Sequence, residues 1–188
     1  MKKYSQLLLG FAVILVGLLG ISSQAHAVTH YVQSSTPTIF VHGWGSSSHA
    51  EEKMANAARD AGVTKTIVRA NVDRKGKVTF NHQIPANAVN PIVEVNLEDN
   101  KLSAYQDDYT QGYHHGGGYV KNVVLALEKQ HHYKQINLVG HSMGNLEIIN
   151  YINDNVNDKS LPQVAYLVAI AGHYNGLVGQ SNVQDAKV

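Results

Sequence analysis

Cysteine is absent from the 188-residue chain, and this absence excludes several kinds of chemistry. Without thiols the protein can form neither a disulfide framework nor a thiolate metal site. It also has no catalytic cysteine and no cysteine that a lipid could modify as a membrane anchor. Reactive groups must therefore be of other types, and the eleven histidines are the first to inspect.

Charged residues are also scarce. Asp, Glu, Lys and Arg make up 15% of the chain, against about 25% in typical soluble domains, whereas 44% of the residues are hydrophobic. The formal net charge is only +1, so the composition gives no electrostatic signature of nucleic-acid binding. The sequence excludes a disordered polyelectrolyte, predicts no nucleic-acid partner and suits one domain with a packed core.

The first 27 residues have the pattern of a secretory signal peptide. Two lysines precede an uncharged stretch from Leu7 to Ile21, and Ala25-His26-Ala27 provides an A-x-A cleavage signal. A transmembrane anchor is the alternative, but this stretch is shorter than the ~20 apolar residues that a span needs. We therefore expect a signal peptide over 1–27, a domain over 28–188, no stable membrane span after cleavage, and a secreted or cell-surface location.

Short apolar runs alternate with segments of helical periodicity through the rest of the chain. Strands are expected at Thr38–Val41, Thr66–Val68, Lys77–Phe80, Ile92–Val95, Ile136–Val139 and Val164–Ala171. Helices are expected from Ala50 to Gly62 (with Met54, Ala57, Ala58 and Ala61 on the apolar face), from about Gly118 to Leu127, and over Leu146–Ile152. This alternation predicts the α/β class, with a mostly parallel sheet and helices on both faces. The last run is typical of a strand buried on both faces of such a sheet.

The sharpest motif is Gly140-His141-Ser142-Met143-Gly144, a G-x-S-x-G pentapeptide. It follows an apolar strand and opens an amphipathic helix, which is the context of a nucleophile elbow. There the serine takes a strained backbone conformation that projects its hydroxyl beyond the sheet, and the flanking glycines let helix and strand approach. We therefore predict that Ser142 is a catalytic nucleophile. A serine in an ordinary strand–helix turn is the alternative interpretation.

A second motif, His42-Gly43-Trp44-Gly45, ends the first strong strand. A serine hydrolase needs two backbone N–H groups directed at the developing oxyanion. One belongs to the residue after the nucleophile and the other to a loop after an earlier strand. Met143 would supply the first, and Trp44 or its neighbour Gly43 the second. Losing one such donor typically costs ~10²–10³ in rate.

Together these motifs identify a resemblance. The segments Thr38–Gly43, Glu98–Asn100, Asn137–Gly144 and Lys159–Pro162 resemble those of a lipase-like family of α/β-hydrolases that Gram-positive bacteria export to the cell surface. The resemblance covers about residues 36–176 and implies a serine hydrolase fold acting on small-molecule ester or acyl substrates.

The resemblance implies that Ser142 is the nucleophile and that the backbones of Trp44 and Met143 are oxyanion donors. Two residues depart from the pattern of that family. Asn145 stands where relatives often have another glycine, and His173 replaces a proline that is common there.

The remaining triad members are harder to place. An α/β-hydrolase orders its triad as serine, acid and histidine. The acid and the histidine normally lie on loops after two further strands, which with their helices would take on the order of 50 residues. After the Val164–Ala171 run, the only acid is Asp185 and the only histidine is His173, in the reverse order. We therefore expect a fold that is incomplete at its C-terminal strands, with impaired catalysis. His173 could lie near Ser142 but is otherwise a loop residue, and Asp154 and Asp158 would solvate the end of the elbow helix.

Two histidine pairs, His114-His115 and His131-His132, raise the question of a metal. Adjacent histidines on a helix do not share a face, and no ligand spacing accompanies them, so we expect neither a metal nor another cofactor. The glycines that follow, 116–118, favour a mobile loop at the site entrance. We expect His42 and His141 to support the site rather than to act as bases.

Four tyrosines between positions 105 and 119 leave one alternative function open. Tyr105, Tyr109, Tyr113 and Tyr119 could line an entrance for an acyl group or a sugar, or they could be partly buried in the core. If the former, the chain could be a non-catalytic cell-surface binding module on a hydrolase scaffold.

Overall fold

The computed structural model describes residues 30–177, 179 and 180. The predicted signal peptide therefore lies outside the described residues, as does Asp185. His30 and Tyr31 belong to an N-terminal unit, and the second unit, which begins at Val32, contains every helix and strand described below.

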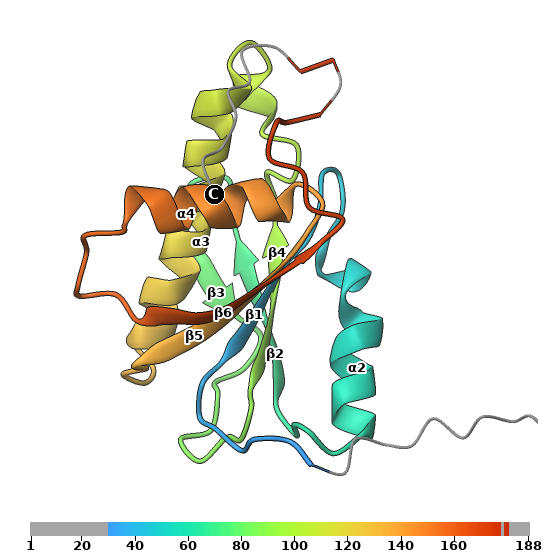
Figure 1. The fold of residues 1–188 in the computed structure, drawn as a ribbon, viewed down its shortest axis with the longest axis vertical. Helices are drawn as coiled ribbons and strands as arrows, with labels where there is room; N and C mark the ends of the chain where they lie inside the picture. The colour runs from blue at the N-terminus through green and yellow to red at the C-terminus, as the bar shows by residue number, and fades with distance from the viewer. Residues whose placement is uncertain (1–29, 178, 181–188) are drawn as a thin grey trace, which may run out of the picture. The chain divides into compact units, whose positions relative to one another are not determined.

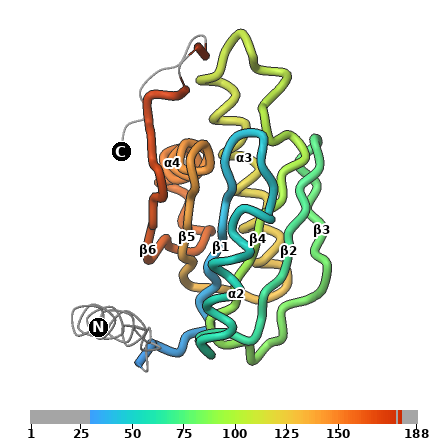
Figure 2. Tube along the Cα trace, turned by 90° about the vertical axis from the view of Figure 1, so that its right-hand side faces the viewer, coloured from blue at the N-terminus to red at the C-terminus, as the bar shows by residue number. Residues whose placement is uncertain are grey.

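A six-stranded sheet forms the centre of the second unit. Its strands are β1 (Thr38–Val41), β2 (Ile67–Val72), β3 (Val78–Phe80), β4 (Ile92–Leu97), β5 (Gln135–His141) and β6 (Gln163–Ile170). They lie in the order β3-β2-β4-β1-β5-β6, and only the β2–β3 pair is antiparallel (Figure 2). All six expected strands are confirmed, as is the mostly parallel sheet.

Helices cover both faces of this sheet, as expected. They are α2 (Glu52–Asp60), α3 (Tyr109–Glu128) and α4 (Gly144–Asp154), with short 3₁₀ turns η1 (Ser48–Ala50) and η2 (Ser103–Tyr105). Figure 1 shows α2 on one side of the sheet and α3 and α4 on the other. The larger core lies under α3 and α4, and a smaller one around Phe40, Ile92 and Val139 contacts Ala55 of α2.

Helix α2 presents a different face to the sheet from the one that the sequence suggested. Ala55 is fully buried, whereas Met54 is 40% exposed and Ala57 is also exposed. Small side chains at Ala55 and Ala58 let the helix lie close to the sheet. The larger Met54 therefore points toward solvent.

Helix α3 begins nine residues earlier than expected, so the prediction of a mobile loop at Gly116–Gly118 was wrong. Asp108 caps the helix by accepting a hydrogen bond from the Gln111 N–H at 3.1 Å. The glycines serve close helix packing: a β-carbon on Gly116 would lie 2.7 Å from Glu147 Cγ, and one on Gly117 would lie 2.8 Å from the Tyr151 amide nitrogen. Residues that looked like a loop signal thus form the contact between α3 and α4.

Strand β6 is not buried on both faces, which corrects a second expectation. Tyr166 is 73% exposed and Val168 is 51% exposed. The strand pairs with β5 on one side and lies at the edge of the described sheet. A strand at the edge of a sheet is less covered than a central strand. The run of hydrophobic residues in β6 therefore predicted more burial than the structure shows.

Candidate functional site

Ser142 lies at the junction between β5 and α4, where the two elements meet at a sharp turn. Its φ is +52°, a left-handed conformation that is uncommon for a residue other than glycine. The flanking glycines are sterically required, since a β-carbon on Gly144 would collide with the Val41 carbonyl and one on Gly140 with the Asn145 side chain. The local geometry is therefore that of the elbow that the pentapeptide predicts.

The Gly43–Gly45 loop lies directly against this turn. A β-carbon on Gly43 would be only 2.9 Å from Ser142 Cβ, so only glycine fits here. Met143 precedes α4, and the first N–H groups of a helix have no acceptor within it. Among the described residues, neither the Trp44 N–H nor the Met143 N–H donates to another backbone carbonyl. Both amides are thus free of backbone partners in the described part of the chain.

Asn100, just after β4, is bonded to the same loop. The Gly45 N–H donates to the Asn100 carbonyl at 2.7 Å, and the Asn100 side-chain amide donates to the Ser46 carbonyl at 2.6 Å. Gly45 takes a left-handed φ of +65° within this arrangement. Asn100 therefore fixes the loop that contains Trp44.

His42 is completely buried and links the loop to β4. The Leu97 N–H donates to His42 Nε2 at 3.1 Å, so the ring proton is on Nδ1, which donates to the Gly43 carbonyl at 2.9 Å. Burial lowers the pKa of His42, which keeps the ring neutral. With both nitrogens engaged, His42 has no free nitrogen to act as a base.

His141, next to the serine, is directed elsewhere. Its Nδ1 lies 3.4 Å from Glu51 Oε1, and the Glu51 side chain is almost completely buried. Burial raises the pKa of Glu51 to about 7. His141 and Glu51 therefore join the elbow to the segment that leads into α2.

A third histidine does reach Ser142. His173 Nε2 lies 3.4 Å from Ser142 Oγ, and His173 is half-buried in the loop after β6. Its other ring nitrogen, Nδ1, is buried and has no hydrogen-bond partner among the described residues. Of the two placements that the sequence left open for His173, the one beside Ser142 is observed.

Asn145 ties the elbow to the end of β6. Its side-chain amide donates to the carbonyls of Ser142 (3.0 Å) and Ile170 (3.1 Å), and the Ser142 N–H donates to the same Ile170 carbonyl at 3.0 Å. The sequence marked Asn145 only as a departure from the family pattern. The available signal in the sequence was an amide side chain at the first turn of the helix after the elbow, because such a group needs partners where it is buried.

The candidate acids are engaged away from this turn. Asp154 contacts His114 Nδ1 at 2.8 Å, and Asp158 accepts from the Ser160 N–H and hydroxyl and contacts Lys121. Both follow or end α4, as expected for residues that solvate its far end.

The other histidines of the two adjacent pairs also contact neighbouring residues. His115 Nε2 lies 2.9 Å from the Tyr119 hydroxyl, His131 Nε2 lies 2.7 Å from the Ile84 carbonyl, and His132 Nδ1 lies 3.7 Å from Glu128. Within residues 30–177, 179 and 180, no three His, Asp or Glu side chains gather as metal ligands. No helix in this part of the chain is long and apolar enough to cross a membrane.

The tyrosines of α3 belong to the core. Tyr113 and Tyr119 are each 2% exposed and Tyr109 is 8% exposed, while Tyr105 packs against the same cluster. They therefore do not form a surface for an acyl group or sugar, and the binding-module alternative loses the residues on which it depended.

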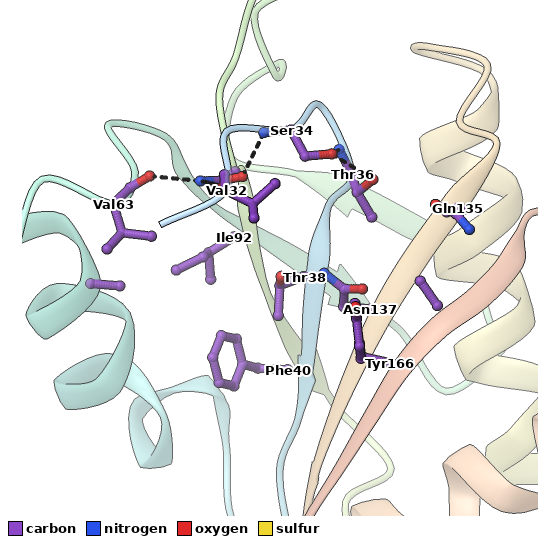
Figure 3. Close-up of a pocket in the computed structure, with 13 residues that line it drawn as sticks. Val32, Ser34, Thr36, Thr38, Phe40, Val63, Ile92, Gln135, Asn137 and Tyr166 are labelled. Atoms are coloured by element: carbon purple, nitrogen blue, oxygen red, sulfur yellow. Dashed lines mark hydrogen bonds between the residues drawn. The ribbon is translucent and has the colours of Figure 1, made fainter. Parts of the chain in front are cut away.

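A pocket of about 540 Å³ lies on the α2 side of the sheet (Figure 3). Its lining includes Thr38, Ile92, Gln135 and Tyr166, which stand at or near the beginnings of their strands. Ser142 follows the opposite end of β5, some seven residues or ~20 Å along the strand. This pocket is therefore separate from the Ser142 site. None of its described lining residues is a histidine, a carboxylate or a cation.

Solved structures share this architecture. The gene lin2722 product of Listeria innocua is 27% identical to the chain, with a TM-score of 0.65 over 77% of this chain and 54% of that one. The "putative cell surface hydrolase from Lactobacillus plantarum WCFS1" is 19% identical, with a TM-score of 0.63 over 74% of this chain and 54% of that one. The chain thus spans about half the length of these proteins.

No curated protein matches the chain significantly. Residues 25–188, by contrast, match a family over most of the sequence. On this match and on its fold, the chain belongs to the family described as alpha/beta hydrolase of unknown function (DUF915).

Proposed function

We propose that this protein is an exported serine ester hydrolase in which Ser142 is the nucleophile. The observation that carries the proposal is the left-handed backbone of Ser142, at +52°, on a strand–helix turn packed against Gly43. Strain of this kind persists where the surrounding structure enforces it, and it is concentrated at active sites.

The backbone amides of Trp44 and Met143 are the proposed oxyanion donors. The loop that contains Trp44 lies against the serine, and Met143 N–H is at the unsatisfied start of α4. Two such donors would stabilise the negative charge that develops on a carbonyl oxygen during attack. The proposed substrate is a small-molecule ester or acyl compound, with no cofactor and no metal.

Catalysis is expected to be slow. No carboxylate contacts His173 among the described residues, so an imidazolium formed there would lack the partner found in a complete triad. Removal of triad function in a serine protease costs about 10⁶ in turnover and leaves ~10³–10⁴ over the uncatalysed reaction. We therefore expect Ser142 to react readily with activated reagents but to turn over esters slowly.

A fluorophosphonate probe and a p-nitrophenyl ester test the proposal on the full chain. We expect the probe to modify Ser142, as located by peptide mass spectrometry, and both labelling and turnover to be lost in Ser142→Ala. Ser103→Ala, at an exposed serine, is the matched control and should behave as the wild type. Equal labelling of the wild type and Ser142→Ala would refute the proposed function.

Export is a separate part of the proposal. It is supported by the signal-like pattern of residues 1–27 and by the name of the Lactobacillus plantarum structure. Expression in a Gram-positive host, followed by N-terminal sequencing of the extracellular and cell-wall fractions, should give a chain that starts at Val28. Recovery of only the uncleaved chain inside the cells would contradict export.

A further inference from the structure

His173 is placed beside Ser142 by a turn that the rest of the fold holds firmly. Strand β6 ends at Ile170, and Ala171 then takes a left-handed φ of +48°. The Ile170 carbonyl accepts two hydrogen bonds from the elbow, one from the Ser142 N–H and one from the Asn145 side chain. The start of the His173 loop is therefore fixed relative to the serine by direct bonds.

The contact itself has the geometry of a nucleophile and its base. The distance of 3.4 Å from Ser142 Oγ to His173 Nε2 is slightly longer than an ordinary hydrogen bond. Such contacts are commonly loose in sites without substrate and tighten when it binds. His173 is half-buried, so it is partly accessible to solvent.

The two other histidines near this turn are unsuitable. Both ring nitrogens of His42 are bonded to backbone groups, and His141 is directed at Glu51. Only His173, among the described histidines, has a ring nitrogen in contact with the Ser142 hydroxyl.

We infer that His173 is the general base for Ser142, so that the site works as a serine–histidine dyad. The inference rests on the proposed hydrolase function and assigns the role of base to a histidine in the loop that follows β6.

The proton balance of the reaction follows from this assignment. As Ser142 Oγ forms a bond to the ester carbonyl carbon, its proton passes to His173 Nε2 and the carbonyl electron pair moves to the oxygen. The carbon–oxygen bond to the alcohol then breaks, and the proton on Nε2 passes to the leaving alkoxide. Water then attacks the acyl carbon and gives a proton to Nε2. The bond between Ser142 Oγ and the acyl carbon breaks, the carboxylic acid leaves, and Nε2 returns the proton to Ser142 Oγ.

The test is the rate of fluorophosphonate labelling, in which an Oγ–P bond forms, the P–F bond breaks and the serine proton passes to the base. We expect His173→Ala and His173→Gln to label at least about 100-fold more slowly than the wild type, within the range that general bases contribute. Added imidazole should restore part of the rate in His173→Ala, because it can occupy the vacated space and accept the proton. His132→Gln, at a histidine with a 99% exposed side chain, is the matched control and should label normally.

The outcomes separate this inference from the proposed function. If the wild type and His173→Ala label Ser142 at the same rate, His173 is not the base, while the hydrolase proposal stands. Slow labelling that imidazole does not restore would assign His173 a structural role and would also overturn the inference. If the wild type labels no faster than Ser142→Ala, the proposed function fails and the dyad fails with it. Thermal unfolding of each variant verifies that the fold is retained.

Discussion

Gly117 of α3 and Tyr151 of α4 are in backbone contact: a β-carbon on Gly117 would lie 2.8 Å from the Tyr151 amide nitrogen. Backbone atoms cannot move aside as the end of a side chain can. The neighbouring Gly118 has no heavy atom within 4 Å of the corresponding position. Two adjacent glycines in one helix therefore meet opposite surroundings.

Gly117→Ala should destabilise the protein and Gly118→Ala should stabilise it. Overpacking typically costs about 1–3 kcal/mol, whereas alanine is favoured over glycine in a helix by about 1 kcal/mol. The free energy of unfolding measured in urea should thus fall in the first variant and rise slightly in the second. Equal effects of the two substitutions would show that the helices do not make this close contact.

Glu147 should make the stability depend on pH. Its side chain is fully buried beside Gly116, neither carboxyl oxygen has a hydrogen-bond partner among the described residues, and burial, with Asp99 nearby, raises its pKa to about 8. The unfolded chain releases this proton near the ordinary value of 4.5, before the folded chain does. The free energy of unfolding should therefore fall as pH rises from about 4.5 to about 8, by at most ~1.4 kcal/mol per pH unit for this group.

Glu147→Gln removes this titration, so its stability should change less between pH 5 and pH 8 than that of the wild type. Urea unfolding at the two pH values measures the difference. Glu51, whose pKa is also raised, keeps a smaller slope of the same sign. Glu98→Gln, at an exposed carboxyl group, should retain the wild-type slope. Parallel curves for Glu147→Gln and the wild type would contradict the assignment.

Asn100→Ala should slow the reaction of Ser142 without unfolding the protein. It removes the side-chain bond to the Ser46 carbonyl and so loosens the loop that presents the Trp44 N–H. Loss of one oxyanion donor costs ~10²–10³ in rate, and a loosened donor should lose part of that. The measurement is serine-dependent ester turnover, with Asn56→Ala on α2 as the control. An unchanged rate in Asn100→Ala would show that this loop does not assist the reaction.

Val168→Lys should reduce self-association. Strand β6 (Gln163–Ile170) contains no charged residue, lies at the edge of the described sheet and exposes half of Val168. Uncharged apolar edges favour pairing with other chains, and lysine opposes it. Val156→Lys, at a valine that is 75% exposed outside the sheet, is the matched control. Sedimentation at several concentrations should show the reduction only in Val168→Lys, and equal behaviour of the two variants would exclude pairing through β6.

The sequence predicted the sheet and the elbow because both depend on local patterns. Val139 and Ile148 belong to strongly periodic runs, and the pentapeptide around Ser142 requires its own turn. The approach of Gly43 to Ser142 was also predictable, since parallel strands bring their carboxyl ends to one edge. Local chemistry was sufficient for these features.

Other features depend on partners distant in the chain. The glycines at 116–118 indicated a loop because nothing in their neighbourhood identifies Glu147 and Tyr151 as the groups that need the space. The exposure of Tyr166 depends on what covers β6, which its own composition does not specify. The contact of His173 with Ser142 requires the left-handed turn at Ala171, and alanine carries no sequence signal for that conformation.

The loop beside the elbow also has an optical consequence. Trp44 is the sole indole in the chain, is 43% exposed, and has the Lys101 ammonium 4.9 Å from its ring centroid. Ultraviolet emission excited at the red edge of protein absorbance therefore originates from a single position, in the loop that lies against Ser142. Displacement of that cation or shielding of the ring by a molecule entering the site would alter the spectrum without any added dye.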